Sequence, residues 1–169
     1  MPQEVSTAKA FIWQGNPRRW YSSGGMNSDI EHKSKYIYWS TPQRRDEIQV
    51  GDKAYIWRTA GAPGDGPRGI IATGTVAETP QDSRDPKSQF KHPERLGPGT
   101  GEEAASSRWK TGISIAEVRL GPETGMLTVE MLHSVCPDLS ILQNARGTVF
   151  RINAEQCKKL GELWARNRR

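Results

Sequence analysis

Three tryptophans share a setting that suits the binding of a flat, polar ligand. Trp13, Trp39 and Trp57 each stand at or near the C-terminal end of a predicted strand, and polar residues follow each of them directly. Stacking of a nucleobase on an aromatic ring is worth about 1–3 kcal/mol, and side-chain amides can read the hydrogen-bonding edge of the base. If the strand ends meet at one rim of the sheet, they form a pocket for a base. The residues predicted to bind it are Trp13, Gln14, Gly15, Asn16, Trp39, Ser40 and Trp57.

Each tryptophan taken alone has a simpler interpretation as a core residue. Large aromatic side chains dominate the cores of small domains. The same setting occurs three times, however, with polar neighbours in each case. This repetition favours a pocket over a purely structural role.

Basic residues surround the predicted strand ends. Contacts from such residues to phosphates would anchor a nucleic acid without reading its sequence. Taken singly, each of them is better explained as a solvated surface residue. The two adjacent pairs, Arg18 with Arg19 and Arg44 with Arg45, flank the aromatic strand ends and are the stronger candidates. The full set predicted to contact the backbone is Arg18, Arg19, Arg44, Arg45, Arg58, Arg68, Lys87 and Lys91.

The sequence contains no recognisable group of catalytic residues. His32, His92 and His133 are scattered, with no His, Cys or carboxylate at metal-ligand spacing. The glycine-rich stretches GAPGDGPRG and GPGTG lack the Gly-Lys-Ser/Thr ending of a phosphate-binding loop. A Gly-x-Ser-x-Gly nucleophile motif is also missing. We therefore expect a binding protein rather than an enzyme, with no metal and no cofactor.

Composition favours a small basic protein with a polyanionic partner. The 169 residues carry a formal net charge of +5, with a pI of about 9.4, which is compatible with nucleic-acid binding. Cys136 and Cys157 are expected to be free thiols in a reducing compartment. No apolar stretch has the length of a signal peptide or a membrane span. We predict a cytoplasmic protein that does not contact membranes.

Hydrophobic patterning predicts a mixed α+β domain. Strands are predicted at 9–13, 36–40, 53–58, 70–79, 110–120 and 147–152. Helical segments are predicted at 16–22, 29–35, 43–49, 126–135, where a strand is the alternative, and 154–167, with Asn153 as the cap. Residues 80–108 are predicted to be a long loop. Because the strands follow one another as hairpins, we expect one domain built on a curved sheet or barrel of about five or six strands.

Several stretches resemble one known family. They are FIWQGNP, YWSTPQRRDEIQ, VGDKAYIWR, RGIIATGTVAETP and, near the C-terminus, ILQNARGTVFRINAEQCKKLGELW. The chain is similar here to the EVE domain, a member of the PUA-like superfamily that is related to the YTH readers. The resemblance covers most of the chain apart from about 81–108. Its most specific part is the Gly-Asp with its aromatic strand, followed by Gly-Ile.

The resemblance implies a curved, barrel-like sheet with flanking helices and an aromatic cage that accepts a flipped base. EVE domains are implicated in reading modified cytosines in DNA, and YTH domains read methylated adenine in RNA. By this resemblance Trp39 and Trp57 correspond to pocket aromatics, and residues 14–16 border the pocket. Arg44 and Arg45 correspond to positions near the nucleic-acid backbone.

The leading hypothesis is a reader of modified bases in DNA that accommodates a flipped 5-methylcytosine or 5-hydroxymethylcytosine. A reader of modified or structured RNA is a second hypothesis, and a binder of a small modified nucleoside is a third. The chain shows no nuclease domain, so any cleavage would require a separate nuclease or effector protein as a partner.

Overall fold

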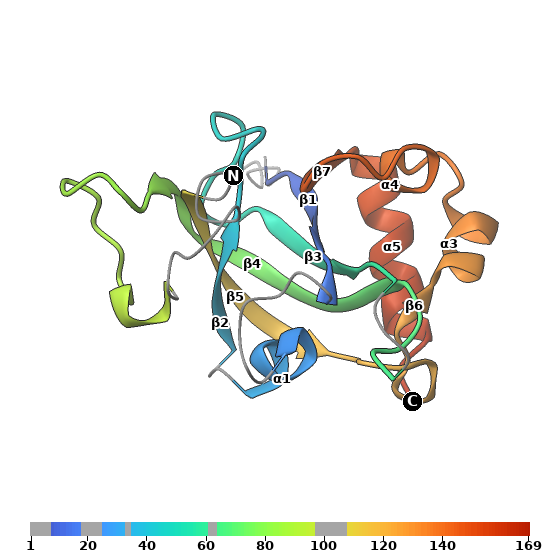
Figure 1. Cartoon of the computed structure of the whole chain (residues 1–169). Coiled ribbons are helices and arrows are strands. Elements are labelled where there is room, and N and C mark those ends of the chain that lie inside the picture. Colours follow the sequence, from blue (N-terminus) through green and yellow to red (C-terminus); the bar gives the residue numbers. More distant parts are fainter. Residues whose placement is uncertain (1–7, 18–24, 33–34, 61–63, 97–107) are drawn as a thin grey trace, which may run out of the picture.

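The computed structural model describes residues 8–17, 25–32, 35–60, 64–96 and 108–169. Seven strands in these ranges form one curved, open sheet (Figure 1). Six of them lie in the order β2-β5-β4-β3-β1-β7, and β6 pairs with β4. The strands are β1 (Ala10–Gly15), β2 (Tyr36–Ser40), β3 (Lys53–Arg58), β4 (Gly69–Asp82), β5 (Trp109–Val118), β6 (Leu127–Thr128) and β7 (Val149–Ile152).

Strand pairing is antiparallel except between β1 and β3. These two strands run parallel, with Ala10 opposite Lys53 and Gly15 opposite Arg58. The predicted hairpin of β3 and β4 is present. The predicted fold class, α+β with a curved sheet, is thus confirmed. The sheet has seven strands instead of five or six, because the 126–135 segment begins with the short strand β6 before it turns into a helix.

The helices described lie on both sides of the sheet. α3 (Val129–Val135), α4 (Ser140–Gln143) and α5 (Ala154–Arg166) gather near β6 and β7, and α1 (Gly25–His32) lies beside β5 (Figure 1). Two single-turn 3-10 helices, η2 (Pro93–Arg95) and η3 (Pro122–Thr124), complete the elements. None of the helices in the described ranges is long and apolar enough to cross a bilayer.

The predicted cap of the last helix is confirmed. The Asn153 side chain accepts a hydrogen bond from the Gln156 N–H at 2.8 Å, and the Gln156 side chain accepts one from the Asn153 N–H at 2.9 Å. This reciprocal pair satisfies two backbone donors that the start of a helix leaves free. Helical spacing in this segment predicts that Cys157, Leu160 and Trp164 face the core. Leu160 and Trp164 are buried, whereas Cys157 is only partly buried.

Two hydrophobic clusters lie on opposite faces of the sheet. In β1 the side chains alternate, so that Phe11 and Trp13 join one cluster and Ile12 joins the other. Trp39 belongs to the first cluster and Trp57 to the second. Trp57 therefore lies on the opposite face of the sheet from Trp13 and Trp39, whereas the sequence pattern predicts all three in one pocket.

Two predicted segments differ from the structure. The helix expected over 43–49 is wrong: these residues form turns, and Arg44 has a positive φ of 57°, which a right-handed helix does not allow. The expected loop from 80 to 108 begins later, because β4 continues to Asp82. It also contains η2, and residues 97–107 lie outside the described part. Most of the turn expected over 16–22 lies outside it as well.

The loop that follows β4 is held to the sheet through the buried side chain of Glu78 in β4. Its carboxylate accepts hydrogen bonds from the Tyr36 and Tyr38 hydroxyls and from the Lys91 N–H. The Tyr38 hydroxyl accepts a further bond from the His92 N–H at 3.0 Å. Burial would raise the pKa of the Glu78 carboxyl, but these hydrogen bonds hold that pKa below its usual range.

Candidate functional site

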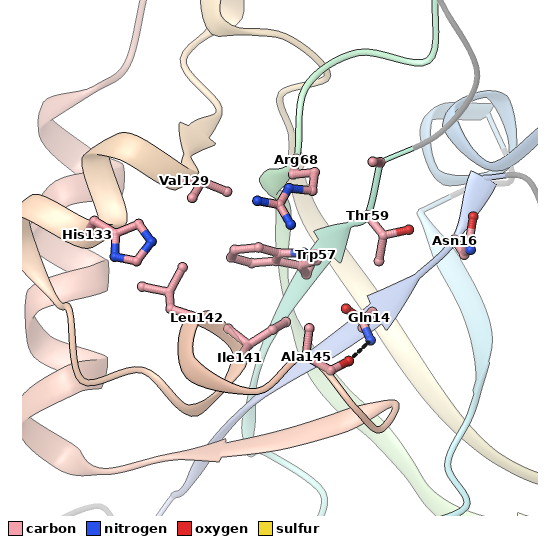
Figure 2. Close-up of a pocket in the computed structure, with 11 residues that line it drawn as sticks. Gln14, Asn16, Trp57, Thr59, Arg68, Val129, His133, Ile141, Leu142 and Ala145 are labelled. Carbon is pink, nitrogen blue, oxygen red and sulfur yellow. Dashed lines mark hydrogen bonds between the residues drawn. The ribbon is translucent and has the colours of Figure 1, made fainter.

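A hollow of about 380 Å³ lies between the C-terminal ends of β1 and β3 and the helices α3 and α4 (Figure 2). This volume is within the range of small-ligand sites. Four predicted site residues line it, namely Gln14, Asn16, Trp57 and Arg68. The other lining residues are Thr59, Ala60, Val129, His133, Ile141, Leu142 and Ala145.

Trp57 forms the aromatic wall of the hollow. Its ring lies between Arg68 on one side and Ile141 and Leu142 on the other (Figure 2). Trp57 is 3% exposed, so only a small part of the ring faces the hollow. No described residue accepts a hydrogen bond from its indole N–H, whereas Trp13 and Trp39 donate to Thr41 Oγ1 and the Gln14 carbonyl.

Gln14 is held in place by the loop that precedes β7. Its Nε2 donates hydrogen bonds to the carbonyls of Ala145 at 3.0 Å and Gly147 at 2.7 Å. Because both partners are acceptors, they fix the orientation of the amide and occupy both of its N–H groups. The amide can therefore offer a ligand its oxygen but not its nitrogen.

Thr59 supplies a buried hydroxyl that has no partner. Its backbone N–H donates to the Gly15 carbonyl at 2.9 Å, which extends the pairing of β1 and β3 by one residue and fixes its position. Its Oγ1 is buried without a hydrogen-bond partner among the described residues. Leaving such a group unpaired costs about 1–3 kcal/mol. A hydroxyl can donate and accept, so either kind of polar group on a ligand would satisfy it.

Two residues that can carry positive charge stand at the rim. Arg68 is exposed and forms no ion pair with any described residue. His133 lies in α3, and its side chain is exposed. In Figure 2 they flank Trp57 on different sides of the hollow. The site thus combines an aromatic wall, an unpaired hydroxyl, a fixed amide oxygen and an exposed guanidinium.

Arg58 does not contact the solvent, and its predicted role at a nucleic-acid backbone is corrected. It is 0% exposed and lies in β3 rather than in a loop. Its guanidinium donates to the Pro67 carbonyl at 2.9 Å and to Asn27 Oδ1 at 3.1 Å. Burial lowers the pKa of this guanidinium. Arg58 instead connects α1 with the segment that carries Arg68.

Trp13 and Trp39 lie in the core cluster on the other face of the sheet and do not line the hollow. In the register of β1 and β3, Trp57 lies opposite Gln14, so Trp57 and Trp13 point to opposite faces. A cage in which these indoles sandwich one base is therefore absent from the described residues.

Gly15 lets β1 approach Trp39 closely. A Cβ atom at Gly15 would lie 2.6 Å from Trp39 Cζ2 and 2.7 Å from Met26 Cε, so any larger residue would force these side chains apart. Ser40, the residue after Trp39, accepts a hydrogen bond from Lys110 Nζ at 3.0 Å. Gly15 and Ser40 are thus near Trp39 rather than at the hollow.

The other predicted backbone contacts occupy different surfaces. Arg44 and Arg45 are exposed in the turn after β2, and Lys87 and Lys91 are exposed in the loop after β4. Arg18 and Arg19 lie outside the described residues. Their proposed contacts with phosphates remain predictions.

Sequence reasoning missed the wall of the hollow that comes from α3 and α4. Val129, His133, Ile141 and Leu142 are brought there by the packing of two helices against the sheet, and no local motif marks them. Thr59 carried a signal, because it is one of the polar residues that follow Trp57. Its buried, unpaired hydroxyl is visible only in three dimensions.

The fold is similar to several solved structures. Human THYN1 in complex with DNA containing 5-methylcytosine matches with a TM-score of 0.62 and 10% identity, over 93% of this chain and 98% of that one. A hypothetical protein from Leishmania major matches with a TM-score of 0.62 and 15% identity, over 94% and 96%. The YTH domain of Zygosaccharomyces rouxii MRB1, in complex with N6-methyladenosine RNA, matches with a TM-score of 0.50 and 10% identity, over 94% and 88%.

No protein-family model matches the chain, and no curated protein matches it either. The identities to the solved structures are low, so the comparisons establish the fold and not the ligand. They agree with the curved-sheet fold that the resemblance implied, since a THYN1 structure and a YTH domain are both among the neighbours.

Proposed function

We propose that this protein reads modified bases in nucleic acid, and that DNA carrying 5-methylcytosine or 5-hydroxymethylcytosine is its principal ligand. The observation that carries the proposal is the hollow around Trp57, with its unpaired Thr59 hydroxyl and the exposed Arg68 at the rim. The fold it shares with THYN1, whose structure holds DNA containing 5-methylcytosine, supports the choice of ligand. In this proposal the protein binds and does not catalyse.

The chemistry of the hollow fits a flipped base better than a fully apolar ligand. A base could place its face against Trp57, Ile141 and Leu142 and its polar edge towards Thr59 and the amide oxygen of Gln14. The exocyclic amine of cytosine is a donor that either oxygen could accept. Arg68 at the rim could contact a phosphate beside the extruded nucleotide.

The cost of flipping a base sets how much binding free energy the hollow must supply. Flipping a base out of a duplex costs a few kcal/mol. Stacking against one aromatic ring contributes about 1–3 kcal/mol, and each hydrogen bond that satisfies a buried group adds about 1 kcal/mol. These contributions roughly offset flipping, so net affinity must come from phosphate contacts. We therefore expect binding to weaken steeply as salt rises.

RNA is the second candidate ligand. The similarity to the YTH domain, whose structure holds N6-methyladenosine RNA, favours it. A single-stranded ligand would avoid the cost of opening a duplex. A free modified nucleoside would fit the same hollow, but it would gain nothing from phosphate contacts, so its binding would depend little on salt.

Fluorescence anisotropy on matched oligonucleotides at one salt concentration tests the proposal. The set contains duplexes with cytosine, 5-methylcytosine, 5-hydroxymethylcytosine or N6-methyladenine, together with single-stranded RNA with and without methylated adenine. We expect the tightest binding to a duplex with one of the modified cytosines. Tighter binding to methylated RNA would favour the RNA reader instead. Equal binding to all members of the set would rule out a reader of these modifications.

A further inference from the structure

A second group of side chains, away from the hollow, has the features of a nucleic-acid contact. Trp109 is half-buried at the start of β5, and two guanidinium groups lie near its ring. The Arg45 Cζ atom is 4.1 Å from the ring centroid, and the Arg108 Cζ atom is 6.0 Å from it. Residues 45 and 108 are far apart in the sequence, so the fold itself assembles this group.

The two arginines differ in how well their charge is already neutralised. Arg108 Nε lies 3.5 Å from an Asp82 carboxylate oxygen, which offsets part of its charge. Arg45 forms no ion pair within the described part of the chain. Its neighbour Arg44 is paired with Glu47 at 3.1 Å, so Arg45 is the cation of this turn that keeps its full charge available.

Stacking on Trp109 prepares the Arg45 guanidinium for binding. A guanidinium that packs on an aromatic ring uses its face for that contact and leaves its N–H groups free at the edge. Those N–H groups match the oxygens of a phosphate. Because the ring already limits the motion of the side chain, less conformational entropy is lost on binding.

We propose that Arg45, Trp109 and Arg108 form a phosphate clamp that holds the backbone of a nucleic-acid strand outside the base-binding hollow. Arg45 makes the direct phosphate contact, Trp109 positions it, and Arg108 adds a second, partly neutralised cation. The clamp rests on the proposed function for the identity of its partner, a nucleic acid. It does not depend on which base is recognised, since phosphate contacts carry no sequence information.

Binding of modified and unmodified duplexes, measured over a series of salt concentrations, tests the clamp. The variants are Arg45→Gln, which removes the free charge, and Trp109→Leu, which removes the platform and keeps both arginines. Trp109→Phe is the conservative variant that retains a ring. Arg166→Gln removes an exposed arginine in the last turn of α5 and is the matched control. Thermal unfolding of each variant shows whether it is folded.

For Arg45→Gln we expect about fivefold weaker binding to both duplexes, and a slope of log affinity against log salt that is smaller by about 1. Trp109→Leu should weaken both duplexes by a similar factor with little change in slope, because the cation remains but is no longer held. Trp109→Phe should restore most of the affinity. Arg166→Gln should bind like the wild type.

The outcomes separate the clamp from the reader. If Arg45→Gln binds both duplexes with wild-type affinity and slope, the clamp is excluded even when preference for a modified base persists. If the wild type shows no preference but Arg45→Gln still loses affinity and slope, the reader fails and the clamp stands. A wild type that binds no nucleic acid at all would overturn both. Should Trp109→Leu fail to fold, the affinity and salt slope of Arg45→Gln still decide the outcome.

Discussion

At the scale of single residues, hydrogen bonding distinguishes the tryptophans better than burial does. Trp13, Trp39 and Trp57 are all at most 3% exposed. Trp13 and Trp39 nevertheless have acceptors for their N–H groups, as buried indoles normally do. Trp57 has none among the described residues, and it is the one that faces the hollow. This N–H is not among the buried unpaired atoms, so it is open to water or to a ligand in the hollow.

Replacement of Thr59 by valine should move stability and affinity in opposite directions. Valine keeps the shape of threonine and removes the unpaired hydroxyl, so the free energy of unfolding of the unliganded protein should rise by up to about 1 kcal/mol. Affinity for the preferred oligonucleotide should fall about five- to tenfold, because the ligand loses a hydrogen-bond partner. Urea denaturation and anisotropy measure the two effects.

The matched control for this change is Thr75→Val, at an exposed position of β4. It should alter neither quantity by much. A Thr59→Val protein that gains stability and binds as tightly as the wild type would show that this hydroxyl does not face the ligand.

The residue types of the site could be predicted only in part. The sequence predicts Gln14, Asn16 and Trp57 at a base pocket and Arg68 at the nucleic-acid backbone, and all four line the hollow. The sequence pattern predicts Trp13 at the same site, because side-chain alternation within β1 and within β3 does not reveal the register between the two strands. Once their register is known, Trp13 must face away from Trp57.

At the scale of elements, the Glu78 cluster connects the sheet to the loop that follows β4. Tyr36 and Tyr38 are on β2, Glu78 is on β4, and Lys91 and His92 belong to the loop. Burial and the hydrogen bond to Glu78 raise the pKa of Tyr38 to about 12, so its hydroxyl stays a donor at neutral pH. The ring of Phe90 packs edge-on against Tyr38, with centroids 5.2 Å apart.

We expect Glu78→Gln to destabilise the protein by about 1.5–3 kcal/mol at pH 7, since hydrogen bonds to a buried charged group are lost. The folded-state pKa of Glu78 lies below its usual value of 4.5. The contribution of its charge is therefore complete above about pH 4.5 and is lost as the pH falls through the lower, folded-state pKa. Denaturation at several pH values measures this difference.

Glu162→Gln, at an exposed position of α5, is the control. It should leave the free energy of unfolding unchanged at each pH measured. A gap between wild type and Glu78→Gln that stays constant down to pH 2 would mean that the charge of Glu78 is not what stabilises the loop.

Helices and strands could be predicted from the sequence where local propensity and the tertiary structure favour the same conformation. β2 and β3 were predicted with their observed bounds, and the Asn153 cap of α5 was placed correctly, because strand propensity and capping chemistry act locally. The 43–49 segment has helix-forming residues in QRRDEIQ, yet it forms turns. There Glu47 pairs with Arg44 and with Arg151 of β7, and Ile48 is buried. Such contacts override helix propensity and cannot be read from the segment itself.

At the scale of the whole molecule, β1 has the central structural position in the part of the sheet near the hollow. It pairs with β3 on one side and β7 on the other. Its side chains reach both core clusters, and Gln14 lines the hollow. The parallel pairing of β1 with β3 was not predicted, because hairpin patterns reveal antiparallel neighbours and long crossovers leave no local signature.

Hydrogen exchange followed by mass spectrometry or NMR should reflect this position. Amides of β1 and β3 are paired inside the sheet, so we expect them to exchange only through global unfolding. Amides of β2, at the end of the strand order, should exchange through smaller openings and thus faster. Protection of β2 that equals that of β1 would indicate that the whole sheet opens as one unit.

The hydrogen bonds from Gln14 to the loop before β7 have a consequence for folding during translation. Gln14 and Gly147 are 133 positions apart, and β1 needs β7 to complete its pairing. During translation, at about 5–20 residues per second, the apolar strand Phe11–Ile12–Trp13 must therefore wait several seconds before its last neighbour leaves the ribosome. For that time its apolar side chains lack their final partners and are open to contact with chaperones and other nascent chains. Yield in the cell should thus respond to the speed of synthesis and to chaperone supply.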